Sequence, residues 1–233
     1  MPLPSNLRLN AFKYPLAFIR LIELLFILIA LSSVNSWSYK LTFRCPTNSS
    51  VPDAVVVPVS TFSLSTVHVK QCFGDTKDAE SPLWTTNDDV GGGAGFFYFV
   101  HVLALVTVLA AVFAYVVLWT QYKEDRRIPL GDLAATAACF ALFFFCTSVW
   151  WSSSNGIGHS TGEERVKELL NDEKFWAPGQ ELPADPLKLE THNGLLTISV
   201  LSGWVLVACF AMNCWHVWKE VTPTSPDQPS SLA

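Results

Sequence analysis

Residues 13–37 read KYPLAFIRLIELLFILIALSSVNSW, and this stretch decides the fold class of the chain. From residue 16 to residue 34 it is almost entirely apolar, and its only charges are Arg20 and Glu23. A helix needs about 20 such residues to cross ~30 Å of hydrocarbon. A cleaved signal peptide has a shorter apolar core followed by small residues at the cleavage site. Residues 33–36, SVNS, make a poor cleavage site. The stretch therefore predicts a retained first transmembrane helix.

The two charges of this helix are three positions apart, so they lie on one helix face and can pair. They also lie near the start of the helix, where long side chains can reach the headgroups. We therefore interpret Arg20 and Glu23 as an intramembrane ion pair that positions the first helix. We expect that exchanging the two charges preserves membrane insertion.

Three further apolar runs, residues 96–118, 133–151 and 195–215, contain no Asp, Glu, Lys or Arg. The whole chain is 50% hydrophobic and only 15% charged, whereas about 25% of the residues of soluble proteins are charged. The sequence thus predicts an all-α membrane protein, a bundle of four transmembrane helices at about 16–34, 96–118, 133–151 and 195–215.

Basic residues gather in the short segments that flank these helices. Lys123, Arg126 and Arg127 lie between the second and third helices, and Arg8 and Lys13 precede the first. Since such segments stay in the cytoplasm, we expect both termini there and both long loops on the lumenal or extracellular side. The net charge of −5 then belongs to solvated loops and does not indicate nucleic-acid binding.

The first long loop carries the features of an oxidising compartment. Residues 39–44 alternate apolar and polar side chains and predict a strand, and residues 61–69, rich in Thr, Val, Ser and Phe, predict a second one. Each leads towards a cysteine, so we expect a Cys45–Cys72 disulfide that staples a small β-layer in this loop. The only glycosylation sequon, at Asn48, falls in the same loop and predicts a glycan.

The second long loop and the C-terminus are less informative. Residues 166–175 place apolar side chains at helical spacing and predict a short amphipathic helix, preceded by a capping-box pattern at residues 161–164. Residues 221–233 are rich in Pro and Ser, and we expect a disordered cytoplasmic tail there. The membrane domain then spans residues 1–220.

No pattern in the sequence indicates catalysis. The five histidines are not in metal-ligand spacing with cysteines or carboxylates, and neither a CxxC motif nor a phosphate-binding glycine loop occurs. The chain is therefore expected to be no enzyme and to need no metal or cofactor. Cys214, at the cytoplasmic end of the fourth helix, is a possible palmitoylation site.

Inside the helices the sequence offers small and polar side chains for helix packing. Small residues four apart, as at 110/114, 134/138, 137/141 and 199/203, let helix backbones approach closely. Asn213 is expected to hydrogen-bond a neighbouring helix. Transporters usually carry ionisable residues deep in the membrane, and apart from the first helix we expect uncharged helix interiors here.

Four stretches resemble one family. They are residues 13–20 (KYPLAFIR), 121–137 (QYKEDRRIPLGDLAATA), 148–151 (SVWW) and 213–220 (NCWHVWKE), and they are similar to the helix borders of the synaptophysins, or physins. Physins are vesicle proteins built on the MARVEL four-helix domain, and the likeness covers nearly the whole chain in order. Two features depart from the family: the second long loop lacks a cysteine pair, and the long Tyr/Gly/Pro-repeat tail is absent.

The resemblance implies a non-enzymatic protein of synaptic or other transport vesicles. Such a protein organises the vesicle membrane in exocytosis, associates with cholesterol, forms homo-oligomers and binds a vesicle SNARE of the synaptobrevin type. Without the repeat tail, strictly neuronal expression is not implied. The alternative is a small oligomeric channel or transporter. A claudin-like junction protein fits less well, because the first loop lacks the W…GLW-C-C pattern.

Overall fold

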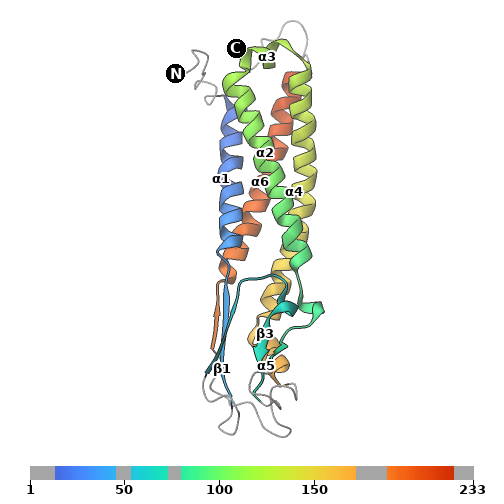
Figure 1. Cartoon of the computed structure of the whole chain (residues 1–233). Coiled ribbons are helices and arrows are strands. Elements are labelled where there is room, and N and C mark those ends of the chain that lie inside the picture. The colour runs from blue at the N-terminus through green and yellow to red at the C-terminus, as the bar shows by residue number, and fades with distance from the viewer. Residues whose placement is uncertain (1–13, 46–53, 73–79, 172–187, 223–233) are drawn as a thin grey trace, which may run out of the picture. The chain divides into compact units, whose positions relative to one another are not determined.

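The computed structural model describes residues 14–45, 54–72, 80–171 and 188–222 (Figure 1). Four helices in these ranges are long and apolar enough to cross a membrane, which confirms the predicted class. They are α1 (Pro15–Asn35), α2 (Gly91–Val117), α4 (Arg127–Ser160) and α6 (Asn193–Val221). Asn48 and residues 223–233 of the tail predicted at 221–233 lie outside the described residues, whereas Val221 is the last residue of α6.

The helices extend beyond the apolar runs that predicted them. The largest difference is in α4, which spans Arg127–Ser160 and not 133–151. Its first turn accepts Pro129 because the first backbone N–H groups of a helix have no partner within it. Hydropathy detects only the part of a helix that crosses hydrocarbon, so the polar turns at both ends of α4 were missed.

The chain forms two compact units, which are described separately. The helical unit comprises residues 1–33, 96–148 and 198–233, and the loop unit comprises residues 34–95 and 149–197.

One end of the helical unit is closed by the short helix α3 (Trp119–Glu124). An apolar cluster joins α3 to the ends of the long helices, and its buried members are Leu16, Ala17, Ala111, Tyr115, Trp119, Tyr122 and Val217. Aromatic rings dominate it: Tyr14 stacks on Trp119 with ring centroids 5.6 Å apart. The cluster fixes where α1 begins and α6 ends relative to α3.

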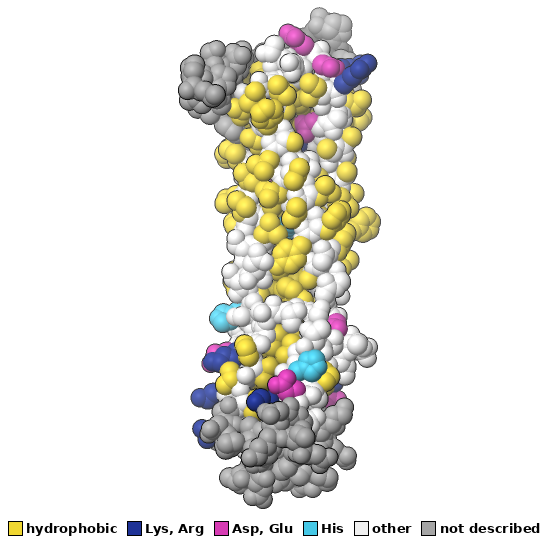
Figure 2. Space-filling model, in the orientation of Figure 1, with side chains coloured by type: hydrophobic (Ala, Val, Ile, Leu, Met, Phe, Trp, Pro, Cys, Tyr) yellow, Lys and Arg dark blue, Asp and Glu magenta, His cyan; other side chains and the backbone are white. Residues whose placement is uncertain are grey.

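Farther along the helical unit, the core is an aromatic layer. Phe143 of α4 stacks on Phe210 of α6 at 5.2 Å between ring centroids. His101 of α2 meets Phe143 edge to face at 4.9 Å, and its Nδ1 lies 2.8 Å from the carbonyl oxygen of Phe97. Figure 2 shows hydrophobic side chains over much of the outer surface of the helices in this view, as expected of a surface that faces lipid.

Small residues bring two of these helices close together at one point. Gly203 of α6 is buried, and a Cβ atom there would lie 2.7 Å from Oγ1 of Thr147 on α4. The pair 199/203 therefore serves a helix contact within the unit. By contrast, the alanines at 134, 137, 138 and 141 are exposed on the outer face of α4.

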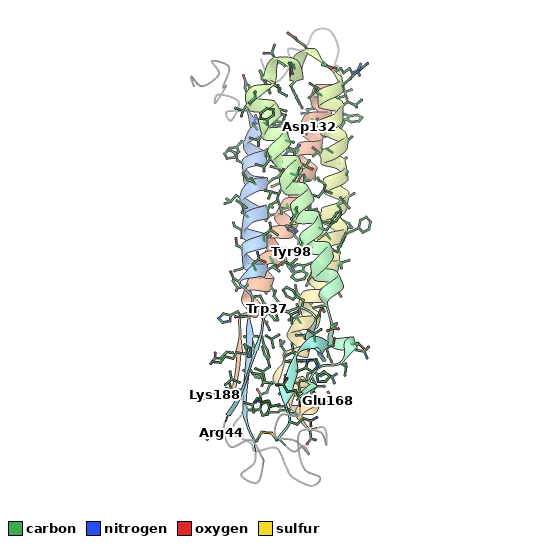
Figure 3. All side chains as sticks on the ribbon, in the orientation of Figure 1. Trp37, Arg44, Tyr98, Asp132, Glu168 and Lys188 are labelled. Carbon is green, nitrogen blue, oxygen red and sulfur yellow. A yellow bond between two sulfur atoms is a disulfide. The ribbon has the colours of Figure 1, made fainter. Side chains whose placement is uncertain are left out.

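The loop unit contains a three-stranded antiparallel sheet in the order β2-β1-β5. Its strands are β1 (Tyr39–Arg44), β2 (Ala54–Val59) and β5 (Lys188–Thr191). The alternating burial of β1 confirms the first predicted strand. Figure 3 labels Arg44 on β1 and Lys188 on β5. Since β5 belongs to the second long loop, the sheet joins both loops and is not confined to the first.

The second predicted strand, at 61–69, is wrong. That segment holds a 3-10 turn (Leu64–Thr66) and only the start of β3 (His68–Lys70), which pairs with β4 (Glu80–Pro82). Its polar side chains bond locally, as when Thr66 Oγ1 donates to the Ser63 carbonyl. The true neighbour of β1 is β2, which was missed because it is a continuous apolar run with a proline. Pro58 is tolerated there because β2 is an edge strand.

The remaining features of the loop unit follow the sequence more closely. The Cys45–Cys72 disulfide is present, as predicted. The short amphipathic helix is α5 (Glu163–Leu170), with Val166 and Leu170 buried. Its predicted capping box is wrong: Gly162 is the N-cap, and the hydroxyl of Thr161 donates to the carbonyl of Ile157 instead.

Asp88 links three segments of the loop unit. Its carboxylate accepts hydrogen bonds from Thr85 Oγ1 at 2.8 Å and from Ser160 Oγ at 3.1 Å. It also pairs with Arg165 of α5 at 3.2 Å, and the hydrogen bonds that the guanidinium makes to Asp88 and Glu168 raise the pKa of Arg165. A buried carboxylate with this many donors holds the chain before α2, the end of α4 and α5 together.

Candidate functional site

The two charges of α1 point into the helical unit. Arg20 and Glu23 are both fully buried, and Nη1 of Arg20 lies 2.9 Å from Oε2 of Glu23. The expectation that these side chains also reach the headgroups is therefore wrong. Their partners lie on other helices, so the pair contributes to helix packing as well as to the position of α1.

The first of these partners is Asp132 of α4. Nη2 of Arg20 donates to Oδ1 of Asp132 at 2.8 Å and also to the hydroxyl of Thr136. Asp132 lies one residue outside the apolar run 133–151, so the hydropathy pattern gave no reason to select it. Because α4 begins at Arg127, Asp132 belongs to its second turn and meets α1.

Two tyrosines complete the environment of Asp132. The hydroxyl of Tyr122 on α3 donates to Oδ2 at 3.0 Å, and the hydroxyl of Tyr115 on α2 donates to the same oxygen. Thr136 also donates to Oδ1 at 3.3 Å. Burial raises the pKa of Tyr122, which therefore remains a phenol and a donor.

The fourth long helix contributes Asn213. Its Nδ2 donates to Oε1 of Glu23 at 2.8 Å, which agrees with the predicted interhelical hydrogen bond of this residue. All five helices of the unit thus meet in one network, which we call the polar cluster: Arg20, Glu23, Tyr115, Tyr122, Asp132, Thr136 and Asn213.

The polar cluster overturns the expectation of uncharged helix interiors outside the first helix. One guanidinium and two carboxylates share this site within the helical unit. Burying charges is costly, and here the charged groups are compensated by direct pairing and by hydrogen bonds from Tyr115, Tyr122, Thr136 and Asn213, although Nε of Arg20 has no partner among the described residues. The sequence did contain a signal, because Asp132 stands one turn before Thr136 at the border of an apolar helix.

An apolar groove of about 380 Å³ runs beside the polar cluster, along α2 and the start of α4. Val106, Ala110, Ala114 and Gly131 are among its lining residues, and Tyr122 and Asp132 supply polar groups. A second groove of about 450 Å³ follows α2 from Tyr98 to Val106. Figure 3 labels Asp132 near the α3 end of the helices and Tyr98 at some distance from it. The first groove can accept an amphiphile with an apolar body and a polar head.

The cysteines of the helices offer no reactive centre. Cys139, Cys146 and Cys209 are buried, and Cys214 is half-buried beside Asn213 on α6. Palmitoylation of Cys214 stays a prediction.

Within residues 14–45, 54–72, 80–171 and 188–222, no group of three His, Cys, Asp or Glu side chains could hold a metal ion.

Four membrane-length helices connected through buried charges, with a disulfide-linked loop unit, define a multi-pass integral membrane protein. Residues 11–216 match the MARVEL family, described as a membrane-associating domain. Because the match covers most of its length, the chain belongs to the MARVEL family.

Proposed function

We propose that this protein is a physin-like organiser of synaptic or other transport-vesicle membranes. In this role it binds a vesicle SNARE of the synaptobrevin type and cholesterol, forms homo-oligomers and turns over no substrate. The proposal is supported by membership of the MARVEL family and by the four physin-like stretches at 13–20, 121–137, 148–151 and 213–220.

The observation that carries this proposal is the outer surface of α2 and α4. The groove beside Ala110 and Ala114 is mostly apolar, and Tyr122 and Asp132 contribute polar groups to its lining. Such a groove can seat a sterol with its hydroxyl near the polar groups. The exposed alanines of α4, including Ala134 and Ala138, allow the helix of another protein to approach closely.

The proposed orientation has both termini in the cytoplasm. Lys123, Arg126 and Arg127 are exposed at the connection from α3 to α4, where positive charge favours the cytoplasmic side. The Cys45–Cys72 disulfide then lies in the oxidising lumen, as does the sequon at Asn48.

A photo-crosslinking experiment tests the proposed role. A photoreactive residue at the exposed Ala110 should capture synaptobrevin, a second copy or a clickable cholesterol analogue on purified vesicles. The matched control is Ala104 on the same helix, which is buried and should capture none of these. Equal capture from both positions, or none of the three partners from Ala110, would overturn the proposal.

The polar cluster gives a specific reason to consider a channel or transporter as the second candidate. Ionisable residues inside membrane helices frequently mark pathways for ions or protons. Purified protein in sealed liposomes distinguishes the two functions. Saturable ion flux that is lost in Asp132→Asn, without SNARE capture on vesicles, would favour the channel. Flux equal to that of empty liposomes, together with SNARE capture, would favour the vesicle organiser.

A further inference from the structure

The charges of the polar cluster do not balance. Arg20 supplies one positive charge, whereas Glu23 and Asp132 supply two negative charges when both are ionised. The other members are neutral hydroxyls and one amide, from Tyr115, Tyr122, Thr136 and Asn213. Among the described residues, the further titratable groups near the cluster are the thiols of Cys139, Cys209 and Cys214, which carry no positive charge.

An uncompensated charge inside a membrane bundle is unfavourable, because hydrocarbon does not solvate it. Binding one proton from solvent removes this cost, because a protonated carboxyl leaves one carboxylate opposite one guanidinium. We propose that the polar cluster binds one proton at neutral pH, carried by Glu23 and hydrogen-bonded to Asn213. This proposal does not depend on the vesicle function.

The hydrogen bonds show which carboxyl group carries the proton. Asp132 accepts from Arg20, Tyr115, Tyr122 and Thr136, and such a set of donors favours the ionised form. Its side chain is also 10% exposed. Glu23 is fully buried and accepts from only Arg20 and Asn213.

Asn213 can serve both protonation states of Glu23. Its Nδ2 donates to Oε1 of Glu23, while its Oδ1 is buried with no hydrogen-bond partner among the described residues. The two ends of an amide are nearly isosteric, so the side chain can be turned over. Oδ1 then accepts the proton from Oε1 of Glu23, and Oε2 continues to accept from Arg20.

The polar cluster borders the neighbouring groove. Asp132 and Tyr122 line the groove along α2 and α4, and both belong to the polar cluster.

Infrared spectroscopy of the full chain in lipid nanodiscs tests the proposal. At pH 7 we expect a carboxylic-acid C=O band that shifts when the side-chain carboxyl carbon of glutamate is labelled with ¹³C. It should disappear in Glu23→Gln. It should also disappear in Asp132→Asn, because Arg20 then balances Glu23 alone. The matched control is Glu190→Gln, which removes an exposed carboxylate of β5 and should leave the band unchanged.

Three results would overturn the proposal. They are the absence of any acid band in the wild type, a band that does not shift with labelled glutamate, and a band that persists in folded Glu23→Gln. The first two need no variant, so the test remains decisive even if a substitution prevents folding.

Discussion

The guanidinium of Arg20 lies 2.8 Å from the carboxylate of Asp132, although 112 positions separate the two residues in the chain. This contact joins α1 to α4 and places the charges of the first helix in the core of the helical unit. Their main physical role is therefore to select how the helices pack, since apolar residues alone provide little directional preference within lipid.

Removing Asp132 should destabilise the helical unit. Asp132→Ala leaves Tyr115 and Tyr122 without their acceptor and deprives Arg20 of one partner. We expect the free energy of unfolding to fall by about 3 kcal/mol. Reversible unfolding in mixed detergent micelles measures this change. Glu124→Ala, at an exposed position of α3, is the control and should change it by less than about 0.5 kcal/mol. Equal losses in both variants would contradict the assigned role of Asp132.

Exchanging the charges of Arg20 and Glu23 should not preserve stability, contrary to the expectation from the sequence alone. In Arg20→Glu/Glu23→Arg, a carboxylate at position 20 would face Asp132, and buried like charges repel. We expect a lower unfolding temperature in the same micelles, with partial recovery when Asp132→Asn is added. A swapped protein as stable as the wild type would show that Asp132 does not contact position 20.

Gly203 should be sensitive to a single added methyl group. In Gly203→Ala the new Cβ would meet Thr147, and the overpacking should cost about 1–3 kcal/mol. Adding Thr147→Ala should restore much of the loss. Gly131→Ala is the control, because a Cβ there meets nothing within 4 Å and should stabilise α4 by up to about 1 kcal/mol. Thermal unfolding measures the stability of each variant. Equal changes in unfolding temperature for Gly203→Ala and Gly131→Ala would contradict close packing at Gly203.

The disulfide should stabilise the loop unit alone. Cys45 and Cys72 are 27 positions apart, and a bridge over such a loop contributes about 3 kcal/mol through the entropy of the unfolded chain. Cys45→Ser/Cys72→Ser should therefore accelerate amide hydrogen exchange in β1 and β2, whereas Cys214→Ser should not. Mass mapping without reduction that finds both thiols unpaired in the wild type would refute the bridge.

Asp88 should be more sensitive to substitution than Glu168, the other carboxylate that pairs with Arg165. Asp88→Ala removes the acceptor of the Ser160 and Thr85 hydroxyls and one of the two carboxylate partners of Arg165, and it should cost about 2–3 kcal/mol. Glu168 pairs with the same arginine but is 70% exposed, so Glu168→Ala should cost below about 1 kcal/mol. Hydrogen exchange of α5 amides measures both, and a larger effect of Glu168→Ala would contradict this ranking.

Local patterns in the sequence were sufficient to predict several features. Four apolar runs identified the four membrane helices, since a helix in hydrocarbon satisfies its own backbone and needs no knowledge of its neighbours. Alternation identified β1, and two cysteines in one loop identified the disulfide. The i, i+3 spacing of Arg20 and Glu23 likewise made their pairing recognisable.

Only the tertiary structure decided which distant groups meet. Asp132 lies outside its apolar run, and nothing local indicates that it faces Arg20. In the same way, β5 joins β1 across more than a hundred residues, and the pairing of β2 depends on an edge position that tolerates Pro58. A local pattern determines whether a segment forms a helix or a strand. Which segments then pack or pair with it depends on the packing of the whole unit.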